Sequence, residues 1–195
     1  GTYLEEVGRC DVIVIDKTGT LTLGKPKVVS VKPLGGRSVA EVLSLAGTAE
    51  QRSEHSLAKA VLDEAKNQGI DLDDPDEFLA RPGYGIIAKY NGREIHVGNL
   101  SLISENGIGI DAVLRRHIDA ESSLGRTSVI VAEDSKVVGV ISISDTLRQG
   151  VKDSISEMRQ VDVKKVVMLT GDTLSVAREV ADQVGIDEVY AGLLP

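Results

Sequence analysis

The residues with the clearest chemical potential begin at Asp16. This aspartate follows the β-branched run at 11–15, which is typical of a strand buried on both faces. A carboxylate at the carboxyl end of a buried parallel strand lies where open α/β sheets hold their reacting groups, and it can attack phosphorus as a nucleophile. Thr18, Gly19 and Thr20 can offer hydroxyl and backbone N–H groups to a phosphate. The alternative is an aspartate that only caps a turn.

A second polar run, Thr170-Gly171-Asp172, follows the apolar residues 166–169. Because the carboxyl ends of parallel strands meet at one edge of a sheet, we expect the Thr170 hydroxyl to lie beside Asp16. Asp172 can also cap the following helix, a role compatible with phosphate binding by Thr170. Two converging strand ends are more specific than one, and together they predict a phosphate-handling site.

A glycine-rich stretch in the same region, Gly19 to Lys25, matches the spacing of a P-loop. The next residue is Pro26, where that motif requires a serine or threonine hydroxyl for magnesium. A strand-like valine run then replaces the helix whose N-terminus would hold the phosphate. The P-loop interpretation is therefore disfavoured.

The elements that must position these residues fall into two kinds. After about residue 125, buried strands alternate with helices, which predicts a doubly wound parallel sheet. Between 33 and 124 the pattern indicates helices and an antiparallel hairpin around Asn91-Gly92, a pair suited to a type I′ turn. Ser38 and Glu41 form a capping box before the first of these helices. We therefore expect an α/β fold split by an inserted α+β domain. The strands expected in the second half of the parallel-sheet domain are 128–132, 137–143 and 166–169.

Composition excludes several classes of protein. The chain has 195 residues, 22 basic against 30 acidic residues, a net charge of -8 and 3% aromatic residues, which argues against a nucleic-acid partner. Cys10 is the single cysteine, so an internal disulfide or a cysteine-cluster metal site is excluded. No segment approaches the ~20 apolar residues of a membrane helix, and no leader is recognisable. We expect a soluble, mixed globular protein.

Several runs resemble motifs of one protein family. Asp16-Lys17-Thr18-Gly19-Thr20-Leu21-Thr22 is similar to the phosphorylation motif of P-type ion-pumping ATPases. Other runs resemble motifs of the heavy-metal-transporting branch and follow in that family's order, so that the resemblance covers essentially the whole chain. These runs are Ser53-Glu54-His55-Ser56-Leu57-Ala58, Pro82-Gly83-Tyr84-Gly85, Val97-Gly98-Asn99 and Thr170-Gly171-Asp172.

The resemblance implies a phosphorylation domain of haloacid-dehalogenase-like fold, a doubly wound parallel sheet split between residues 1–32 and 125–195. It also implies an α+β nucleotide-binding domain, with an antiparallel sheet, at 33–124. ATP and magnesium are the implied cofactors. The glycine-containing connections at 32–36 and 124–126 are expected to form a hinge between the two domains.

The resemblance also implies a role for each motif residue. Asp16 takes the γ-phosphoryl group of ATP, Lys17 and Thr170 steady its oxygens, and magnesium contacts the Asp16 carboxylate and the Thr18 carbonyl. Gly171 and Asp172 complete the catalytic set. Asp145 opens a run that resembles the family's hinge-side aspartate motif. The nucleotide-binding residues are Glu54, His55, Gly83, Gly85, Gly98 and Asn99.

This chain differs from the family pattern at two places. Ser56 follows His55 where the family usually has proline, and the chain ends at Pro195 before a catalytic lysine and a magnesium-binding glycine-aspartate motif. The resemblance therefore implies cytoplasmic domains of a membrane pump. The implied partners are ATP or ADP and the pump's own membrane and actuator domains. The resemblance favours copper over zinc or cadmium as the transported ion, which binds elsewhere in such a pump.

Two other functions are compatible with parts of the sequence. A free-standing phosphatase of the same fold would use residues 33–124 as a cap. Such enzymes carry a second aspartate two residues after the nucleophile as general acid and base, and Thr18 occupies that position here. The longer-lived aspartyl phosphate that Thr18 permits suits a transport cycle. The third possibility is a module that only binds nucleotide.

Overall fold

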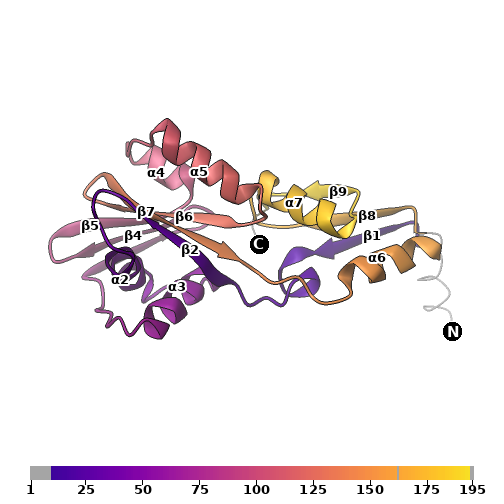
Figure 1. The fold of residues 1–195 in the computed structure, drawn as a ribbon, viewed down its shortest axis with the longest axis horizontal. Coiled ribbons are helices and arrows are strands. Elements are labelled where there is room, and N and C mark those ends of the chain that lie inside the picture. Colours follow the sequence, from indigo (N-terminus) through magenta and orange to yellow (C-terminus); the bar gives the residue numbers. More distant parts are fainter. Residues whose placement is uncertain (1–9, 162, 194–195) are drawn as a thin grey trace. The chain divides into compact units, whose positions relative to one another are not determined.

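The structure is a computed structural model that describes residues 10–161 and 163–193 (Figure 1). The chain divides into two compact units. Unit 1 is formed by the described parts of Gly1–Lys25, Ser122–Gly125 and Asp145–Pro195. Unit 2 is formed by Pro26–Glu121 and Arg126–Ser144.

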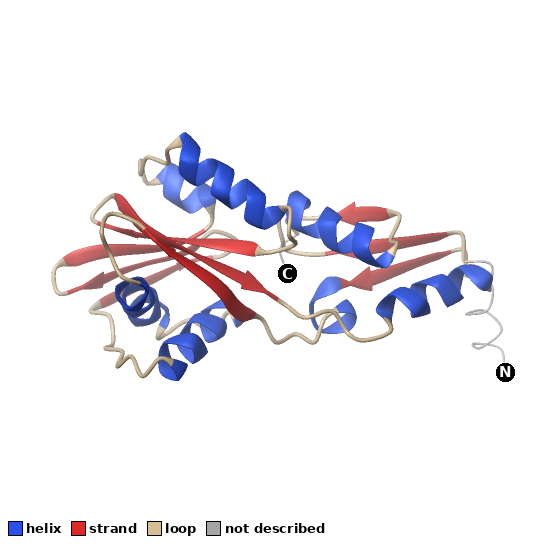
Figure 2. Cartoon of the chain, viewed as in Figure 1, coloured by secondary structure: helices blue, strands red, loops and turns tan. Residues whose placement is uncertain are grey.

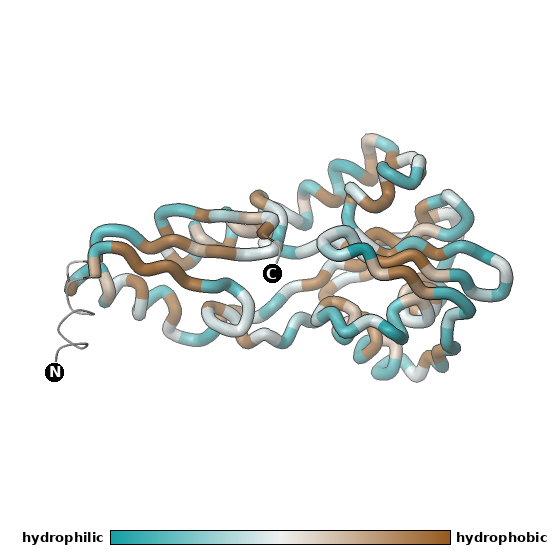
Figure 3. The backbone as a smooth tube through the Cα atoms, turned by 180° about the vertical axis from the view of Figure 1, so that it is seen from behind, coloured by the Kyte–Doolittle hydropathy of each residue, from teal (hydrophilic) through white to brown (hydrophobic). Residues whose placement is uncertain are grey.

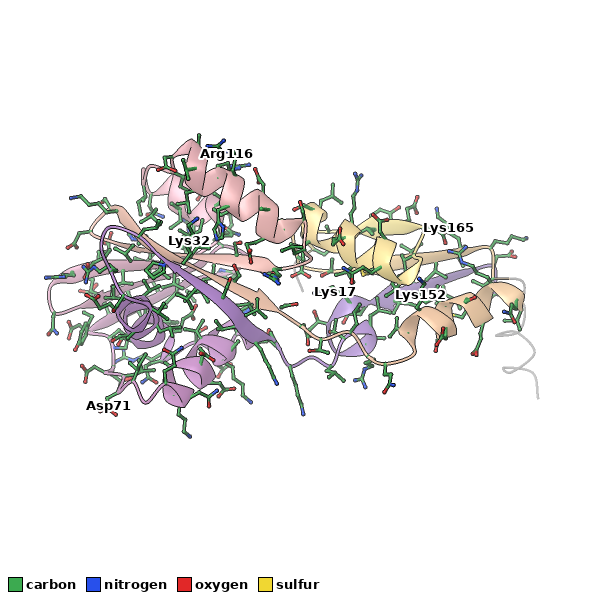
Figure 4. The ribbon with its side chains drawn as sticks, in the orientation of Figure 1. Lys17, Lys32, Asp71, Arg116, Lys152 and Lys165 are labelled. Atoms are coloured by element: carbon green, nitrogen blue, oxygen red, sulfur yellow. The ribbon has the colours of Figure 1, made fainter. Side chains whose placement is uncertain are left out.

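Unit 1 contains a parallel sheet in the order β1-β8-β9. The strands are β1 (Val12–Asp16), β8 (Lys165–Leu169) and β9 (Glu188–Tyr190), and β1 is followed directly by the helical turn η1 (Lys17–Leu21). Lys165 of β8 pairs with Glu188 of β9 at 2.6 Å (Figure 4). The predicted strand–helix alternation is confirmed for this unit.

Two helices complete the core of unit 1: α6 (Val151–Gln160) and α7 (Leu174–Val184). Ile155 of α6 and Ala177 of α7 belong to one apolar cluster with alternate residues of the strands, including Met168. The helix after β8 has Thr173 at its N-cap position, so the possible capping role of Asp172 is not realised. The Asp172 side chain is therefore available for another role.

The strand at 11–15 was predicted to be buried on both faces, but in the described residues only one of its faces is buried. Ile15 is 9% exposed and packs in the core, whereas Val12 and Val14 are 45% and 56% exposed. Successive side chains of a strand point to opposite faces, so the two valines share the face away from this core. The hydrophobic character of β1 and β8 is visible in Figure 3.

Unit 2 is built around an antiparallel sheet in the order β2-β7-β6-β5-β4-β3 (Figure 2). The hairpin predicted around Asn91-Gly92 is present, with φ values of 50° and 74° at these two residues. The strands are β2 (Lys27–Pro33), β3 (Glu77–Arg81), β4 (Gly85–Tyr90), β5 (Arg93–Gly98), β6 (Thr127–Glu133) and β7 (Lys136–Ser144).

Helices cover both faces of this sheet. Along β6, Val129 and Val131 pack in the cluster that includes α2 and α3, whereas Ile130 and Ala132 pack in the cluster that includes α4 and α5. The predicted capping box is confirmed at the start of α2, where Ser38 and Glu41 exchange hydrogen bonds. The helices are α2 (Val39–Glu50), α3 (Ser56–Asn67), α4 (Leu100–Glu105) and α5 (Ala112–Ser122).

The assignment of residues 128–132 and 137–143 to the parallel sheet is wrong. These strands, β6 and β7, pair with each other in antiparallel register, and β2 pairs with β7. Continuous apolar runs fit a buried parallel strand, but they also fit a central antiparallel strand with helices on both faces. Hence the division lies at 25/26 and 144/145, with residues 122–125 in unit 1, rather than at 32/33 and 124/125.

Residues 32–36, expected to form one part of a hinge, lie within unit 2 and do not connect the two units. Residues 34–38 connect β2 to α2 inside unit 2, and the chain passes from unit 1 to unit 2 at Lys25–Pro26. Within residues 10–161 and 163–193, every helix falls short of the length and apolar character that crossing a bilayer requires.

Candidate functional site

The register of unit 1 brings the two polar runs to the same edge of its sheet. Asp16, the last residue of β1, lies opposite Leu169, the last residue of β8. Thr170 follows Leu169 directly and is 4% exposed, whereas Asp16 is exposed. The convergence expected from the sequence is therefore present: an accessible carboxylate lies at the same strand edge as a buried hydroxyl.

Three polar side chains behind this edge are linked through Asp172. Lys17 Nζ lies 2.5 Å from Asp172 Oδ2, and the Lys17 side chain is 8% exposed (Figure 4). The Thr170 hydroxyl donates to the same oxygen at 3.2 Å, while the Asp172 N–H donates to Thr170 Oγ1 at 3.1 Å. The arrangement holds an ammonium group and a hydroxyl beside the end of β1.

The turn after Asp16 is fixed by its own backbone and by Thr22. Gly19 has φ +79°, a conformation that favours glycine, and its N–H donates to Thr22 Oγ1 at 3.2 Å. The Thr22 N–H donates to the Lys17 carbonyl at 3.1 Å. A helical turn followed by strand β2 replaces the strand–loop–helix of a P-loop, in agreement with the sequence argument.

Asp145 contacts this turn. Its carboxylate accepts hydrogen bonds from the Thr22 hydroxyl at 2.5 Å and from the N–H groups of Gly24 and Lys25 at 3.1 Å each. Lys25 and Asp145 are the residues of unit 1 that directly adjoin Pro26 and Ser144 of unit 2. The carboxylate therefore links two of the places at which the chain passes between the units.

Arg148 is a contributor that the sequence argument did not identify. Its guanidinium donates to the Gly19 carbonyl at 2.9 Å and to the Thr22 carbonyl at 3.0 Å. The side chain therefore braces the turn that carries Thr18. The signal was present in the sequence, because Arg148 closes the four-residue run that Asp145 opens.

Oxygen donors at this edge suit a hard cation. Asp16 offers a carboxylate and Thr18 a backbone carbonyl, and Thr18 is exposed. Among the described residues, no group of three His, Cys, Asp or Glu side chains is placed to hold a metal ion. Magnesium is commonly bound by one or two carboxylates with phosphate and water completing its octahedron, so this donor set fits magnesium bound together with a phosphate. Gly171 follows Thr170 in the chain, and a Cβ built on it would be 3.2 Å from the Leu193 carbonyl oxygen.

In unit 2 the structure brings together four of the six residues expected to bind nucleotide. Gly85 and Gly98 are register partners on β4 and β5. A Cβ on Gly85 would lie 2.2 Å from the Val97 carbonyl oxygen, and one on Gly98 would lie 2.3 Å from that of Tyr84, so both positions require glycine.

Asn99 ties this glycine pair to the preceding loop. Its Nδ2 donates to the Gly83 carbonyl at 2.8 Å, and its Oδ1 accepts from the Leu102 N–H at 3.0 Å. The second bond makes Asn99 the N-cap of α4. Gly83, Gly85, Gly98 and Asn99 thus form one local cluster at the ends of β3 and β5.

Glu54 and His55 lie at the start of α3 and are exposed. His55 is the N-cap: its Nδ1 accepts from the Leu57 N–H at 3.1 Å, which leaves Nε2 as the donor nitrogen of a neutral ring. Among the described residues, no hydrogen bond links Glu54 or His55 to the glycine cluster. The histidine ring therefore caps the helix that begins at Ser56.

Glu50 was missed by the sequence argument. The last residue of α2, it is 7% exposed, and burial raises its pKa to about 7 despite a hydrogen bond from Ser53. Its Oε2 is buried with no hydrogen-bond partner. A buried carboxyl group with an unused oxygen five residues before His55 is a candidate ligand. The signal was an acidic residue ending a run of small residues, Ala46-Gly47-Thr48-Ala49.

Comparison with known proteins establishes the class. The family model of haloacid dehalogenase-like hydrolases matches residues 10–194, and the chain belongs to this family. Over all 195 residues it is 38% identical to a copper-exporting P-type ATPase of Staphylococcus epidermidis and 36% identical to one of Staphylococcus aureus. The chain spans about a quarter of the length of these curated relatives, 24% of each.

Solved structures of P-type ATPases are also similar to this chain. A zinc-transporting PIB-type ATPase in the E2.Pi state is 36% identical to this chain, with a TM-score of 0.68. The match covers 98% of this chain and 30% of the zinc-transporting ATPase. The N-domain of HMA8, a copper-transporting P-type ATPase, is 30% identical and matches 60% of this chain and 99% of its own, with a TM-score of 0.52. The catalytic domain of the CPx-ATPase CopB-B, 24% identical, shares the fold over 99% of this chain and 65% of its own, with a TM-score of 0.71.

Proposed function

We propose that this chain is the ATP-binding catalytic part of a heavy-metal-transporting P-type ATPase, and that copper is the transported ion. The observation that carries the proposal is the meeting of Asp16 with Thr170 and Lys17 at one sheet edge. The copper-exporting relatives, which match the whole chain, support the choice of ion. In such a protein both units would lie in the cytoplasm.

The reaction begins at Asp16. A carboxylate oxygen attacks the γ-phosphorus of ATP and forms an O–P bond, while the bond from that phosphorus to the β,γ-bridging oxygen breaks and ADP leaves with the electron pair. Lys17 and Thr170 hold the transferred oxygens, with Gly171 and Asp172 completing this side of the site. Water later attacks the same phosphorus, which releases inorganic phosphate and restores the Asp16 carboxylate.

Magnesium is the proposed metal, held by the Asp16 carboxylate and the Thr18 carbonyl. When bound, it neutralises charge on the phosphoryl oxygens. The turn that carries Thr18 is braced by Arg148 and Asp145 through Gly19 and Thr22, so the carbonyl is held in place before the metal arrives. Asp145 is the proposed hinge residue for movement of unit 2.

Unit 2 is the proposed nucleotide site. The backbone of Gly83, Gly85 and Gly98 permits close approach of a flat base, and Asn99 fixes that loop. His55 offers Nε2 as a donor, and Glu54 is exposed beside it. The protonated carboxyl of Glu50 can both donate to and accept from an adenine edge, which would satisfy its unused oxygen.

Thr18 favours a pump over a phosphatase of the same fold. A threonine hydroxyl does not exchange protons near neutral pH as a carboxyl group does, so hydrolysis of the aspartyl phosphate lacks its usual general acid and base. A phosphoenzyme that persists is what coupling to transport requires.

The experiment is phosphorylation by radiolabelled ATP in the complete pump. We expect an acid-stable, hydroxylamine-sensitive phosphoenzyme, because hydroxylamine cleaves acyl phosphates, and we expect Asp16→Asn to abolish it. Radiolabel that persists on the Asn variant would refute Asp16 as the nucleophile.

A further inference from the structure

The Asp172 carboxylate binds the two side chains that the proposed reaction needs for holding phosphate, Lys17 and Thr170. Its Oδ2 receives both the Lys17 ammonium, at 2.5 Å, and the Thr170 hydroxyl, at 3.2 Å. These two side chains are the ones that would hold the phosphoryl oxygens on Asp16. One carboxylate oxygen of Asp172 therefore accepts from both donors of the proposed phosphoryl site.

Burial explains why the donors need such a partner. The Lys17 side chain is 8% exposed and Thr170 is 4% exposed. A buried ammonium group is strongly unfavourable unless an anion is close, and a buried hydroxyl needs an acceptor. While Asp16 carries no phosphoryl group, Asp172 supplies the anion and the acceptor. The Asp172 side chain is itself 19% exposed, so it retains access to water when its partners turn away.

We propose, on the basis of the function proposed above, that Asp172 is an internal competitor for the phosphoryl group. Its carboxylate holds Lys17 and Thr170 in place while the site is empty and yields them when a phosphoryl dianion arrives. Exchange of partners involves hydrogen bonds and ion pairs alone, and no covalent bond of Asp172 changes. Asp172 acts through two other side chains and is a positioning residue.

The competition has two effects, one on the transfer of the phosphoryl group and one on its retention. Donors that are already held beside the site need only change partner when charge develops on the phosphoryl oxygens, and this small reorganisation speeds transfer. The negative charge of Asp172, held beside the same two donors, also weakens retention of a dianion, because like charges repel. Asp172 would therefore favour both the arrival of the phosphoryl group in the reaction and the later departure of inorganic phosphate.

The first test observes Lys17 in the unaltered 195-residue chain. Its ammonium signal in nitrogen-15 NMR should be protected from hydrogen exchange by the buried pair with Asp172. Titration with orthovanadate in the presence of Mg²⁺, as a phosphate probe, should shift that signal as the partner changes. Saturation with orthovanadate that leaves the Lys17 signal unchanged overturns the proposal.

The second test compares affinities. Asp172→Asn keeps the size of the side chain and removes its charge, so orthovanadate should bind about tenfold more tightly. Asp172→Glu retains the charge and should bind as the parent does, which excludes a merely structural effect. Asp182→Asn, at an exposed position of α7, is the matched control for a change in net charge and should bind as the parent does.

The outcomes separate this inference from the proposed function. Equal or weaker orthovanadate binding by Asp172→Asn overturns the competitor role, and so does an absence of binding in every variant. The proposed function is decided by ATP phosphorylation of Asp16 and by nucleotide binding to unit 2. If nucleotide still binds but Asp172→Asn does not bind orthovanadate more tightly, the competitor role is refuted and the proposed nucleotide site is not.

Discussion

The Thr22 hydroxyl donates a 2.5 Å hydrogen bond to Asp145 Oδ2 across 123 positions of sequence. Thr22 is 1% exposed, so its hydroxyl has no access to water as a substitute partner. The bond joins the segment that leaves unit 1 to the segment that returns to it. Its loss should loosen the turn after the proposed nucleophile.

Asp145→Ala should therefore destabilise unit 1. Removing the carboxylate takes the acceptor from the N–H groups of Gly24 and Lys25 and leaves the buried Thr22 hydroxyl with the Lys17 carbonyl, at 3.2 Å, as its acceptor. A loss of this kind typically lowers the free energy of unfolding by about 1–3 kcal/mol. Urea denaturation measures the loss. In a double-mutant cycle, adding Thr22→Val to Asp145→Ala should lower stability by less than the sum of the single changes. Strict additivity would mean that the hydroxyl and carboxylate do not interact.

Glu50 should make stability depend on pH. Its folded pKa of about 7 lies above the ordinary value of 4.5, because burial disfavours the charged form. The folded state then binds more protons than the unfolded state between these values, so stability should fall as pH rises from about 4.5 to about 7 and level off above. The full effect is about 3 kcal/mol.

Glu50→Gln tests this directly, since an amide stays neutral at every pH. The variant should lose the decline and become more stable than the parent at pH 8, as measured by urea denaturation at pH 5 and pH 8. Glu157→Gln, at an exposed position of α6, should keep the parent's pH profile. A Glu50→Gln profile that still declines would place the titrating group elsewhere.

Nucleotide affinity should depend on His55 more than on Asp16. Loss of one hydrogen bond or stacking contact costs about 1–2 kcal/mol, so His55→Ala should weaken ATP and ADP binding roughly 5- to 30-fold. Asp16→Asn should leave affinity unchanged or raise it slightly, because it removes repulsion of the phosphates. Titration calorimetry ranks the two variants, with Lys59→Ala on the exposed face of α3 as control. The reverse ranking would favour a phosphatase whose substrate binds at Asp16.

Gly98→Ala should disrupt the glycine cluster for a steric reason. A Cβ there would meet the Tyr84 carbonyl oxygen at 2.3 Å, whereas one on Gly109 meets nothing within 4 Å. Neither glycine has a positive φ, so the pair isolates contact from backbone strain. Thermal denaturation should show a loss of about 2 kcal/mol or more for Gly98→Ala and little change for Gly109→Ala. Equal stability of the two variants would show that β4 and β5 can move apart at this position without a loss of stability.

Local rules were enough to predict the edge at which Asp16 and Thr170 meet. A β-branched run ending in aspartate, a second apolar run ending in Thr-Gly-Asp, and the rule that parallel strands end together lead to that geometry. The hairpin at Asn91-Gly92 and the capping box at Ser38 followed equally from short-range chemistry. These features depend on a few adjacent residues.

Pairing partners and burial depended on the whole fold. Strands β6 and β7 were placed in the wrong sheet because an apolar run does not specify whether its neighbours are parallel or antiparallel. Glu54 drew attention as part of a motif, whereas Glu50 is the buried carboxyl group, a property set by the packing of α2 against the sheet. Arg148 was passed over because its acceptors are backbone carbonyls more than 120 residues away.

The edge of unit 2 has an engineering consequence. Lys27 and Ser144 are register partners on β2 and β7, so the chain enters and leaves this unit on adjacent strands. A segment whose two ends already touch can be cut out or grafted into another loop without stretching its host, since closing it requires no long linker. Residues 26–144 are thus transplantable as a cassette, provided that the short excursion at 122–125 travels with them.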